Sequence, residues 1–199
     1  MALAEATRNR IGPNAITRVA EALQAQVGGH LAADVFAAAA LSHHLADPPT
    51  RMVDETEVSR LHQVLRSELG GPVAFAVSRD AGLRTAEYLL AHRIPRPVQA
   101  LLKALPPALA SRLLLSAIGK HAWTFAGSGS FTARAGRPVV LTIRGNPMCV
   151  GQTSDEPMCD FYAATFERLF RALVHPQSVV TETACEACGD EACRFELRW

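Results

Sequence analysis

The sequence predicts an α+β fold in which an N-terminal helical half precedes an antiparallel sheet with a packed helix and a C-terminal, zinc-clipped hairpin. Apolar residues recur at helical spacing up to about residue 119, and β-type runs follow from residue 121. Helices followed by strands are typical of α+β folds. In addition, four of the five cysteines lie between Cys159 and Cys193, which places a candidate metal site in the last fifth of the chain.

The helical half is expected to begin after a flexible lead of about ten residues. Asn14 can cap a first helix, which Gly28 and Gly29 end. An alanine-rich helix follows, and Asp54 with Glu57 resembles a capping box for the next helix. The expected helices cover residues 14–27, 30–45, 55–69, 73–78, 81–92, 98–105 and 107–119.

The second half is expected to contain five strands and one helix. Three β-type runs, at residues 121–126, 130–134 and 138–144, are separated by glycine-containing turns and predict an antiparallel meander. An amphipathic helix is expected over residues 156–173, and two strands over 178–183 and 193–199. We therefore divide the chain into an N-terminal helical region, residues 1–97, and a ligand-binding domain with a cysteine-rich metal site, residues 98–199.

Composition excludes several classes of protein. The formal net charge is +1 and the charges are scattered, so no overall footprint for nucleic acid is present. The first residues do not resemble a signal peptide, and no apolar run reaches about 18 residues without a charge, which argues against a membrane span. We expect a soluble, cytoplasmic protein with reduced thiols.

The cysteine spacing predicts a bound metal. Cys185 and Cys188 form a C-x-x-C pair, Cys193 follows five residues later, and Cys159 lies further upstream. Thiolates are preferred zinc ligands, and the Gly189-Asp190 turn would let the chain fold back around an ion. The alternative is redox-active or inert buried thiols. A disulfide framework is disfavoured, because the cysteines are few and odd in number.

The same residues resemble a known family. Glu182-x-x-Cys185, Gly189-Asp190 and Cys193-x-Phe195, preceded by Cys159-x-Phe-Tyr162, are similar to the motif of the 4-vinyl-reductase domain over about residues 98–199. The whole chain resembles the BchJ family of bacteriochlorophyll-synthesis proteins from purple phototrophs. The domain also occurs in aromatic-sensing transcription activators, and its fold is distantly shared with haem-based gas sensors.

The resemblance implies a structural zinc ion held by Cys159, Glu182, Cys185 and Cys193. Cys188 is an extra thiol that could replace Glu182, and the charge of the site does not distinguish the two. Either set fills all four positions with protein ligands, as in a structural zinc site.

The resemblance further implies a role with a tetrapyrrole. We expect an accessory protein, more a binder than an enzyme, that carries a Mg-porphyrin or chlorophyllide-type intermediate to a partner such as Mg-chelatase or the Mg-protoporphyrin methyltransferase. The alternative is a vinyl reductase acting on a divinyl tetrapyrrole with an external electron donor. Gly127-Ser-Gly129 joins two β-runs and does not match a dinucleotide-binding loop. Family analogy also suggests a homodimer.

His121, Trp123 and Phe125 are the candidate ligand-binding residues. His121 opens the first β-run, where the helices meet the sheet, and such seams favour pockets. Trp123 and Phe125 would share one face of that strand and could line either the core or a ligand. His43 and His44 would point in opposite directions from a helix, which argues against joint ligation. Basic residues along the helical stretch would suit porphyrin propionates or form a solvated face: Arg93, Arg96, Lys103, Arg112 and Lys120.

Overall fold

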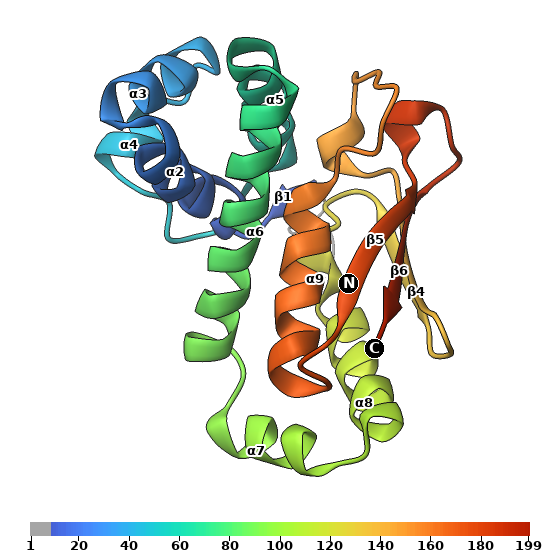
Figure 1. The fold of residues 1–199 in the computed structure, drawn as a ribbon. Coiled ribbons are helices and arrows are strands. Elements are labelled where there is room, and N and C mark those ends of the chain that lie inside the picture. Colours follow the sequence, from blue (N-terminus) through green and yellow to red (C-terminus); the bar gives the residue numbers. More distant parts are fainter. Residues whose placement is uncertain (1–8) are drawn as a thin grey trace.

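The computed structural model describes residues 9–199 and combines helical layers with a four-stranded antiparallel sheet (Figure 1). Eight of the ten residues expected as a flexible lead lie outside this range. Arg10 already belongs to β1 (Arg10–Ile11), which pairs with β2 (Val53–Asp54). Within residues 9–199, no helix has the length and hydropathy that a bilayer span requires.

The first helices are α2 (Asn14–Val27), α3 (Gly29–Ala38), α4 (His43–Ala46) and α5 (Glu55–Leu69). The expected helix over residues 30–45 is wrong, because Ala40 adopts a positive φ of 55° and separates α3 from α4. The cap at Asp54 is confirmed: its carboxylate accepts a hydrogen bond from the Thr56 amide at 2.8 Å.

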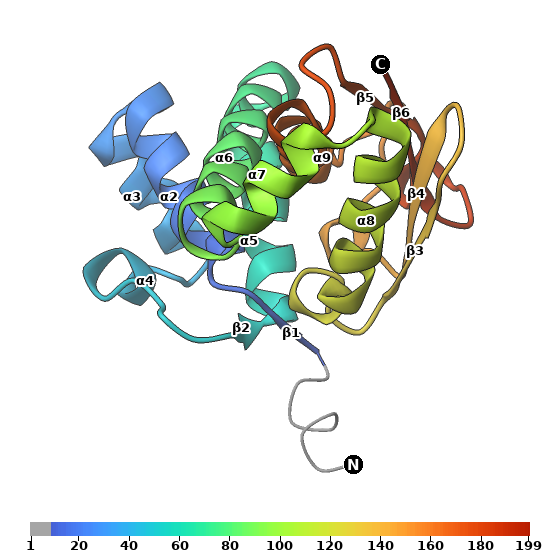
Figure 2. The same ribbon diagram turned by 90° about the horizontal axis from the view of Figure 1, so that it is seen from below.

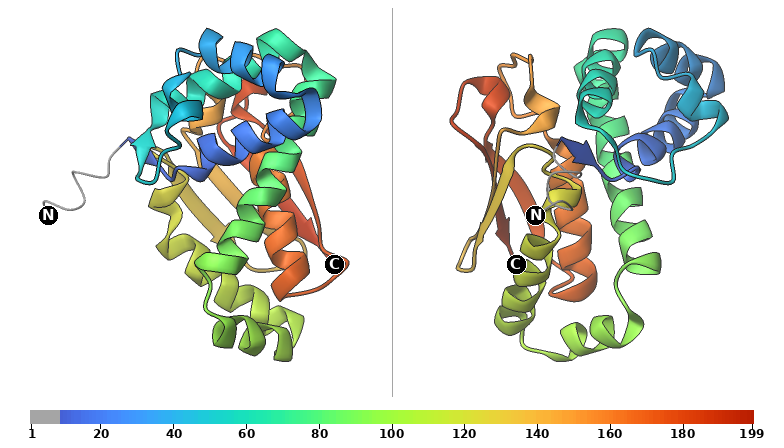
Figure 3. Two further views of the ribbon diagram at one scale, coloured as in Figure 1. Left: turned by 90° about the vertical axis from the view of Figure 1, so that its left-hand side faces the viewer. Right: turned by 180° about the vertical axis from the view of Figure 1, so that it is seen from behind.

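The central helix is α6 (Gly71–His92), a single helix of 22 residues where the sequence predicts two. It packs against α2 on one side and α9 on the other, as Figures 1 and 3 show. The contact with α9 requires Gly82, because a Cβ there would lie 2.3 Å from the Phe161 carbonyl oxygen. The Thr165 hydroxyl donates to the Gly82 carbonyl at 3.0 Å and fixes the same crossing.

Two helices, α7 (Arg96–Ala104) and α8 (Pro107–Lys120), lead from α6 to the sheet. The strand expected at residues 121–126 is wrong: Ala122–Thr124 forms the 3-10 helix η1. The His121 carbonyl accepts from the Thr124 amide at 2.9 Å and from the Thr124 hydroxyl at 2.8 Å. These local bonds use backbone groups that a strand would present to its neighbours.

The sheet has the order β3-β4-β6-β5, with β3 (Ser130–Arg134), β4 (Val139–Arg144), β5 (Val179–Ala184) and β6 (Cys193–Arg198). All pairs are antiparallel. Alternate residues of β4 and β6 are buried, so one face of the sheet points to the core. Helices α8 and α9 (Asp160–Leu173) cover that face (Figure 3).

One hydrophobic core runs through both halves, from Ile11 in β1 to Leu197 in β6. The boundary expected between residues 97 and 98 falls inside α7. The strongest packing between the halves is that of α6 on α9, so both halves contribute to the environment of the cysteine site at the start of α9.

Candidate metal centre

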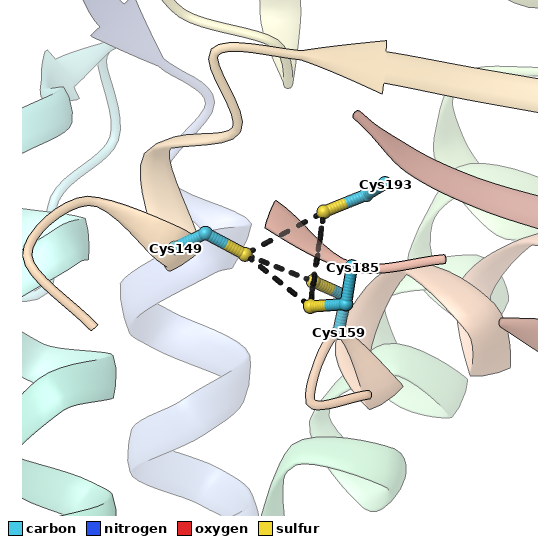
Figure 4. A group of neighbouring side chains, drawn as sticks. All are labelled: Cys149, Cys159, Cys185 and Cys193. Atoms are coloured by element: carbon cyan, nitrogen blue, oxygen red, sulfur yellow. Dashed lines mark hydrogen bonds between the residues drawn. The ribbon is translucent and has the colours of Figure 1, made fainter. Parts of the chain in front are cut away.

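Four thiols meet at one end of the sheet: Cys149, Cys159, Cys185 and Cys193 (Figure 4). Cys149 retains 6% of its accessible surface and the other three retain none. None of the four forms a disulfide. The cluster is therefore a buried group of four free thiols drawn from segments up to 44 residues apart.

The spacing of the sulfurs matches a tetrahedral metal ion. The six sulfur–sulfur distances run from 3.4 Å, between Cys149 and Cys159, to 4.0 Å, between Cys193 and Cys185. Tetrahedral thiolates bound at about 2.3 Å place their sulfurs about 3.8 Å apart. Four sulfur ligands favour Zn²⁺ or an iron–sulfur centre, and filling all four positions is typical of a structural site.

Each thiol is positioned by a different chain segment. Cys149 ends the 3-10 helix η2 (Pro147–Cys149), which follows β4, and Cys159 directly precedes α9. Cys185 follows β5, and Cys193 is the first residue of β6. Since β4 and β6 are neighbours, with Ile143 opposite Cys193, the loop after β4 begins beside the start of β6.

Two polar side chains hold these loops around the sulfurs. The buried Asn146 amide donates to the Cys159 sulfur at 3.1 Å and to the Cys193 sulfur at 3.2 Å. Its oxygen accepts from the Met148 amide at 3.0 Å. The Glu186 carboxylate accepts from the amides of Gly145 and Asn146, both at 2.7 Å. Donors aimed at thiolate sulfurs orient them and stabilise their negative charge.

The N-terminal half also reaches the site through α5. The Ser59 hydroxyl donates to the Pro147 carbonyl, and the Arg66 guanidinium donates to the Met158 carbonyl at 3.2 Å. Burial lowers the pKa of Arg66, while the neighbouring thiols, Cys159 first, act in the opposite direction. A four-thiolate zinc site carries a net charge of −2, so this guanidinium supplies nearby positive charge.

Without a metal the thiols share protons unequally. Hydrogen bonding with Cys149 raises the pKa of Cys159 well above its ordinary value, and burial adds to the shift. Hydrogen bonds from Cys149 and Cys159 lower the pKa of Cys185. Because closely packed thiols cannot all ionise together, a divalent cation that replaces their protons would stabilise the arrangement.

The structure brings together three of the four residues expected as ligands. Cys159, Cys185 and Cys193 converge, but the fourth corner is occupied by Cys149, to which the sequence pattern assigns no role. Glu182 lies beside the cluster: its Oε2 accepts from the Cys159 amide at 2.8 Å, and its Oε1 is buried without a partner among the described residues. Burial raises the pKa of Glu182 to about 9.

Cys188, the alternative ligand, is exposed and lies outside the four-thiol group. It ends the 3-10 helix η3 (Glu186–Cys188), which directs the chain away from the sulfurs after Cys185. The sequence signal for Cys149 is the Gly145-Asn146-Pro147 turn, which ends the strand that neighbours β6.

The three candidate ligand-binding residues do not share a strand face. His121 is exposed and Trp123 is 47% exposed. Phe125 packs into an aromatic cluster, 5.2 Å from Phe131 between ring centroids, and its carbonyl accepts from the Tyr162 hydroxyl at 2.7 Å. Phe125 therefore belongs to the packing between η1 and α9.

A surface cleft of about 280 Å³ lies between α8 and β3. Its lining ends near the candidate histidine, because Gly119 is two residues before His121. The lining residues are Arg112, Leu115, Ser116, Gly119, Phe131, Ala133 and Ala135.

A second group of side chains could hold a cation on the helical half. His43, His44 and Glu57 have ligand atoms within 4.8 Å of one another, and His44 lies 3.0 Å from Glu57. The expectation that His43 and His44 diverge is wrong, since their ring centroids are 4.0 Å apart. The contact already joins α4 to α5 as a hydrogen bond.

Comparison with known proteins places the chain in a family. A model of the 4-vinyl-reductase domain matches residues 139–199, which include all four clustered cysteines. The chain is 47% identical over 192 residues to the bacteriochlorophyll synthase 23 kDa chain of Cereibacter sphaeroides, covering 96% of this chain and 92% of the relative. The corresponding chain of Rhodobacter capsulatus is 38% identical over 188 residues, covering 94% and 86%.

Solved structures extend the similarity of fold. The chain aligns with an Fe(II) unliganded H-NOX protein from K. algicida at a TM-score of 0.61 and 10% identity, covering 94% of this chain and 96% of the other. This likeness concerns the fold alone. On the identities over nearly the full length, the chain belongs to the family of the bacteriochlorophyll synthase 23 kDa chains.

Proposed function

We propose that this chain is a non-catalytic accessory protein of bacteriochlorophyll biosynthesis that binds a Mg-porphyrin or chlorophyllide-type intermediate and carries it between pathway enzymes. The observation that carries the proposal is the 47% identity, over 96% of the chain, to a protein named bacteriochlorophyll synthase 23 kDa chain. The cysteine centre supports a non-catalytic role, because four protein sulfurs would leave no position for substrate or water.

The metal in this proposal is a structural zinc ion held by Cys149, Cys159, Cys185 and Cys193. The near-tetrahedral sulfur spacing supports this set over the one with Glu182. The ion would join the loop after β4, the start of α9 and the β5–β6 hairpin, and so brace the sheet end of the molecule. Its contribution would be to stability rather than to the chemistry of a substrate.

The cleft between α8 and β3 is the proposed pigment site. Its volume of about 280 Å³ is near the lower end of ligand pockets, so a tetrapyrrole would fill it only in part and extend along the surface. Exposed His121, at the end of α8, is the proposed axial ligand for Mg²⁺, and Arg112 would pair with a propionate. Exposed Trp123 would stack on the macrocycle.

The proposal includes a cytoplasmic location, a possible homodimer, and delivery to Mg-chelatase or to the Mg-protoporphyrin methyltransferase. The second candidate function is a vinyl reductase that uses an external electron donor. The word synthase in the relatives' name favours keeping it as an alternative. The two functions differ in whether the pigment leaves the protein chemically changed.

A pigment titration tests the proposal. Mg-protoporphyrin is added to the zinc-loaded protein and the Soret band is followed, with His121→Ala and Arg112→Ala as cleft variants. His30→Ala is the matched control, because His30 is exposed on α3, a separate helix of the N-terminal half. We expect a shifted Soret band that the cleft variants weaken at least about tenfold and the control leaves unchanged.

The chemical fate of the pigment separates the two functions. Recovery of unchanged pigment supports the carrier. Loss of the vinyl group from a divinyl substrate, dependent on an added reductant such as NADPH, would overturn the carrier in favour of the reductase. Absence of any spectral shift at micromolar protein and pigment would remove the support for both.

A further inference from the structure

Large apolar side chains are exposed along α7 and α8. Val98 and Leu101 of α7 are 43% and 55% exposed, and Leu109 and Leu113 of α8 are 47% and 49% exposed. Val98 and Leu101 are three residues apart and Leu109 and Leu113 are four apart, so each pair lies on one face of its helix. We call these residues, with the exposed basic residues between Arg93 and Lys120, the α7–α8 surface.

The charge of this surface has one sign. No aspartate or glutamate occurs between residues 88 and 154, although the chain contains 19 acidic residues in all. Every charged side chain on α7, on α8 and in the link from α6 is therefore basic, and all of them are exposed: Arg93, Arg96, Lys103, Arg112 and Lys120. Within the described residues, no ion pair involves any of these five.

The surface also forms one end of the molecule. Helix α7 lies across the end opposite α3 and α5, and α8 rises from it toward the sheet (Figure 1). Seen from that end, α7 is in the foreground and no other helix covers it (Figure 2). A flat partner could thus approach α7 and α8 without meeting the rest of the chain.

We propose that the α7–α8 surface docks on an anionic lipid bilayer, with the leucine and valine side chains entering the headgroup boundary and the basic side chains contacting lipid phosphates. Exposed leucines beside lysine and arginine are the composition of helices that lie in a membrane interface. Bilayer docking needs charge complementarity and shallow apolar insertion, and this surface offers both. It needs no helix able to span the membrane.

Charge argues against a second copy as the occupant. In a two-fold dimer formed through this surface, the same patch would face itself, so five basic side chains would oppose five others. Anionic lipid removes that repulsion. Since α8 also lines the proposed pigment cleft, docking would hold the cleft beside the bilayer, and this last point rests on the proposed function.

Vesicle co-sedimentation without pigment tests the proposal. The zinc-loaded full chain is mixed with vesicles of phosphatidylglycerol and phosphatidylcholine in equal parts, or of phosphatidylcholine alone. We expect binding to the anionic vesicles at least about tenfold stronger than to the neutral ones, and a marked loss of binding as salt is raised.

Surface variants locate the contact. The double variant Leu101→Glu, Leu109→Glu should reduce the partition coefficient at least about tenfold, and Lys103→Gln about fivefold. Phe75→Glu is the matched control for the apolar change, because Phe75 is 51% exposed at the start of α6. Arg51→Gln, in the exposed loop before β2, is the control for the basic change.

Several outcomes would overturn the proposal. They are equal binding to both kinds of vesicle, no binding at low salt, and loss of binding in the controls as large as in the α7–α8 variants. A dimer in solution that Leu101→Glu dissociates, with no vesicle binding, would assign the surface to a second copy. Because no pigment is present, failure here is separate from failure of pigment binding.

Discussion

The sulfur of Cys149 lies 3.4 Å from the sulfur of Cys159, across the loop that joins β4 to α9. This contact completes a four-thiol group whose other members come from the β5–β6 hairpin. Nine residues separate the two cysteines, so the loop closes on itself at the point where α9 begins. The fourth corner of the site is therefore supplied by a segment that precedes the helix.

Replacing Cys149 with serine should weaken zinc binding strongly, because it removes one of four thiolates from a closed site. We expect the zinc affinity to fall at least about tenfold and the melting temperature to drop. Competition with a chromophoric chelator measures the affinity. Cys188→Ser is the matched control, since Cys188 is exposed and outside the group, and it should retain wild-type affinity. Zinc lost by Cys188→Ser but kept by Cys149→Ser would reverse the assignment.

Asn146→Asp should lower the zinc affinity by about 10- to 100-fold. The substitution keeps an oxygen for the Met148 amide but replaces the two N–H donors to sulfur with a carboxylate that repels thiolates. Gln152→Glu makes the same chemical change a few residues away, where the side chain meets only the Gly151 carbonyl. Chelator competition on both variants should separate them, and equal affinities would show that the N–H···S contacts do not matter.

Glu167→Gln should destabilise the fold by about 2–3 kcal/mol. The buried Glu167 carboxylate binds Arg79 at 2.8 Å, Arg171 at 3.3 Å and the Val180 amide at 3.1 Å, which ties α9 to α6 and β5. Fully buried pairs lose more, but both arginines are partly exposed. Urea unfolding measures the change.

The matched control is Glu87→Gln, in the exposed pair of Glu87 with Arg168 on the same helix contact. Its cost should stay below about 1 kcal/mol. Similar costs for the two variants would contradict the role given to the buried carboxylate.

His62 should make the fold sensitive to acid. It is buried in α5 with neither ring nitrogen hydrogen-bonded among the described residues, and burial lowers its pKa from 6.5 to about 3. Below pH 6.5 the unfolded chain takes up a proton that the folded chain does not. The stabilisation is therefore complete above pH 6.5 and is lost progressively as pH falls toward 3.

Comparison of the wild type with His62→Leu isolates this effect from acid release of metal, which both proteins share. Below pH 6.5 the wild type should lose up to about 1.4 kcal/mol per pH unit more than the variant, as measured by urea unfolding. His30→Leu, at an exposed site, should follow the wild type. Parallel pH profiles for wild type and His62→Leu would contradict the assignment.

The elements that sequence reasoning locates are those with strong periodicity. The strands of the sheet and α9 lie within a few residues of their expected positions, because alternation and helical spacing reflect burial on one face. The strand expected at residues 121–126 is wrong, because β-forming residues such as Trp123 and Phe125 instead follow local bonds within η1. Tertiary context overrides β-propensity there.

The metal site shows the same division. The motif locates Cys159, Cys185 and Cys193, but the choice of the fourth ligand depends on which loops meet in three dimensions. Cys149 reaches the site because β4 lies next to β6 in the sheet, a pairing between strands about 50 residues apart. Glu182, favoured by the family pattern, instead accepts from the Cys159 amide. Linear spacing does not contain either fact.

X-ray absorption at the zinc edge of the purified protein tests the central claim most directly. A tetrathiolate centre of Cys149, Cys159, Cys185 and Cys193 predicts a first shell of four sulfurs at about 2.3 Å, and one sulfur fewer in Cys149→Ser. Three sulfurs with one oxygen at about 2.0–2.2 Å in the wild type, unchanged in Cys149→Ser and lost in Glu182→Gln, would contradict it.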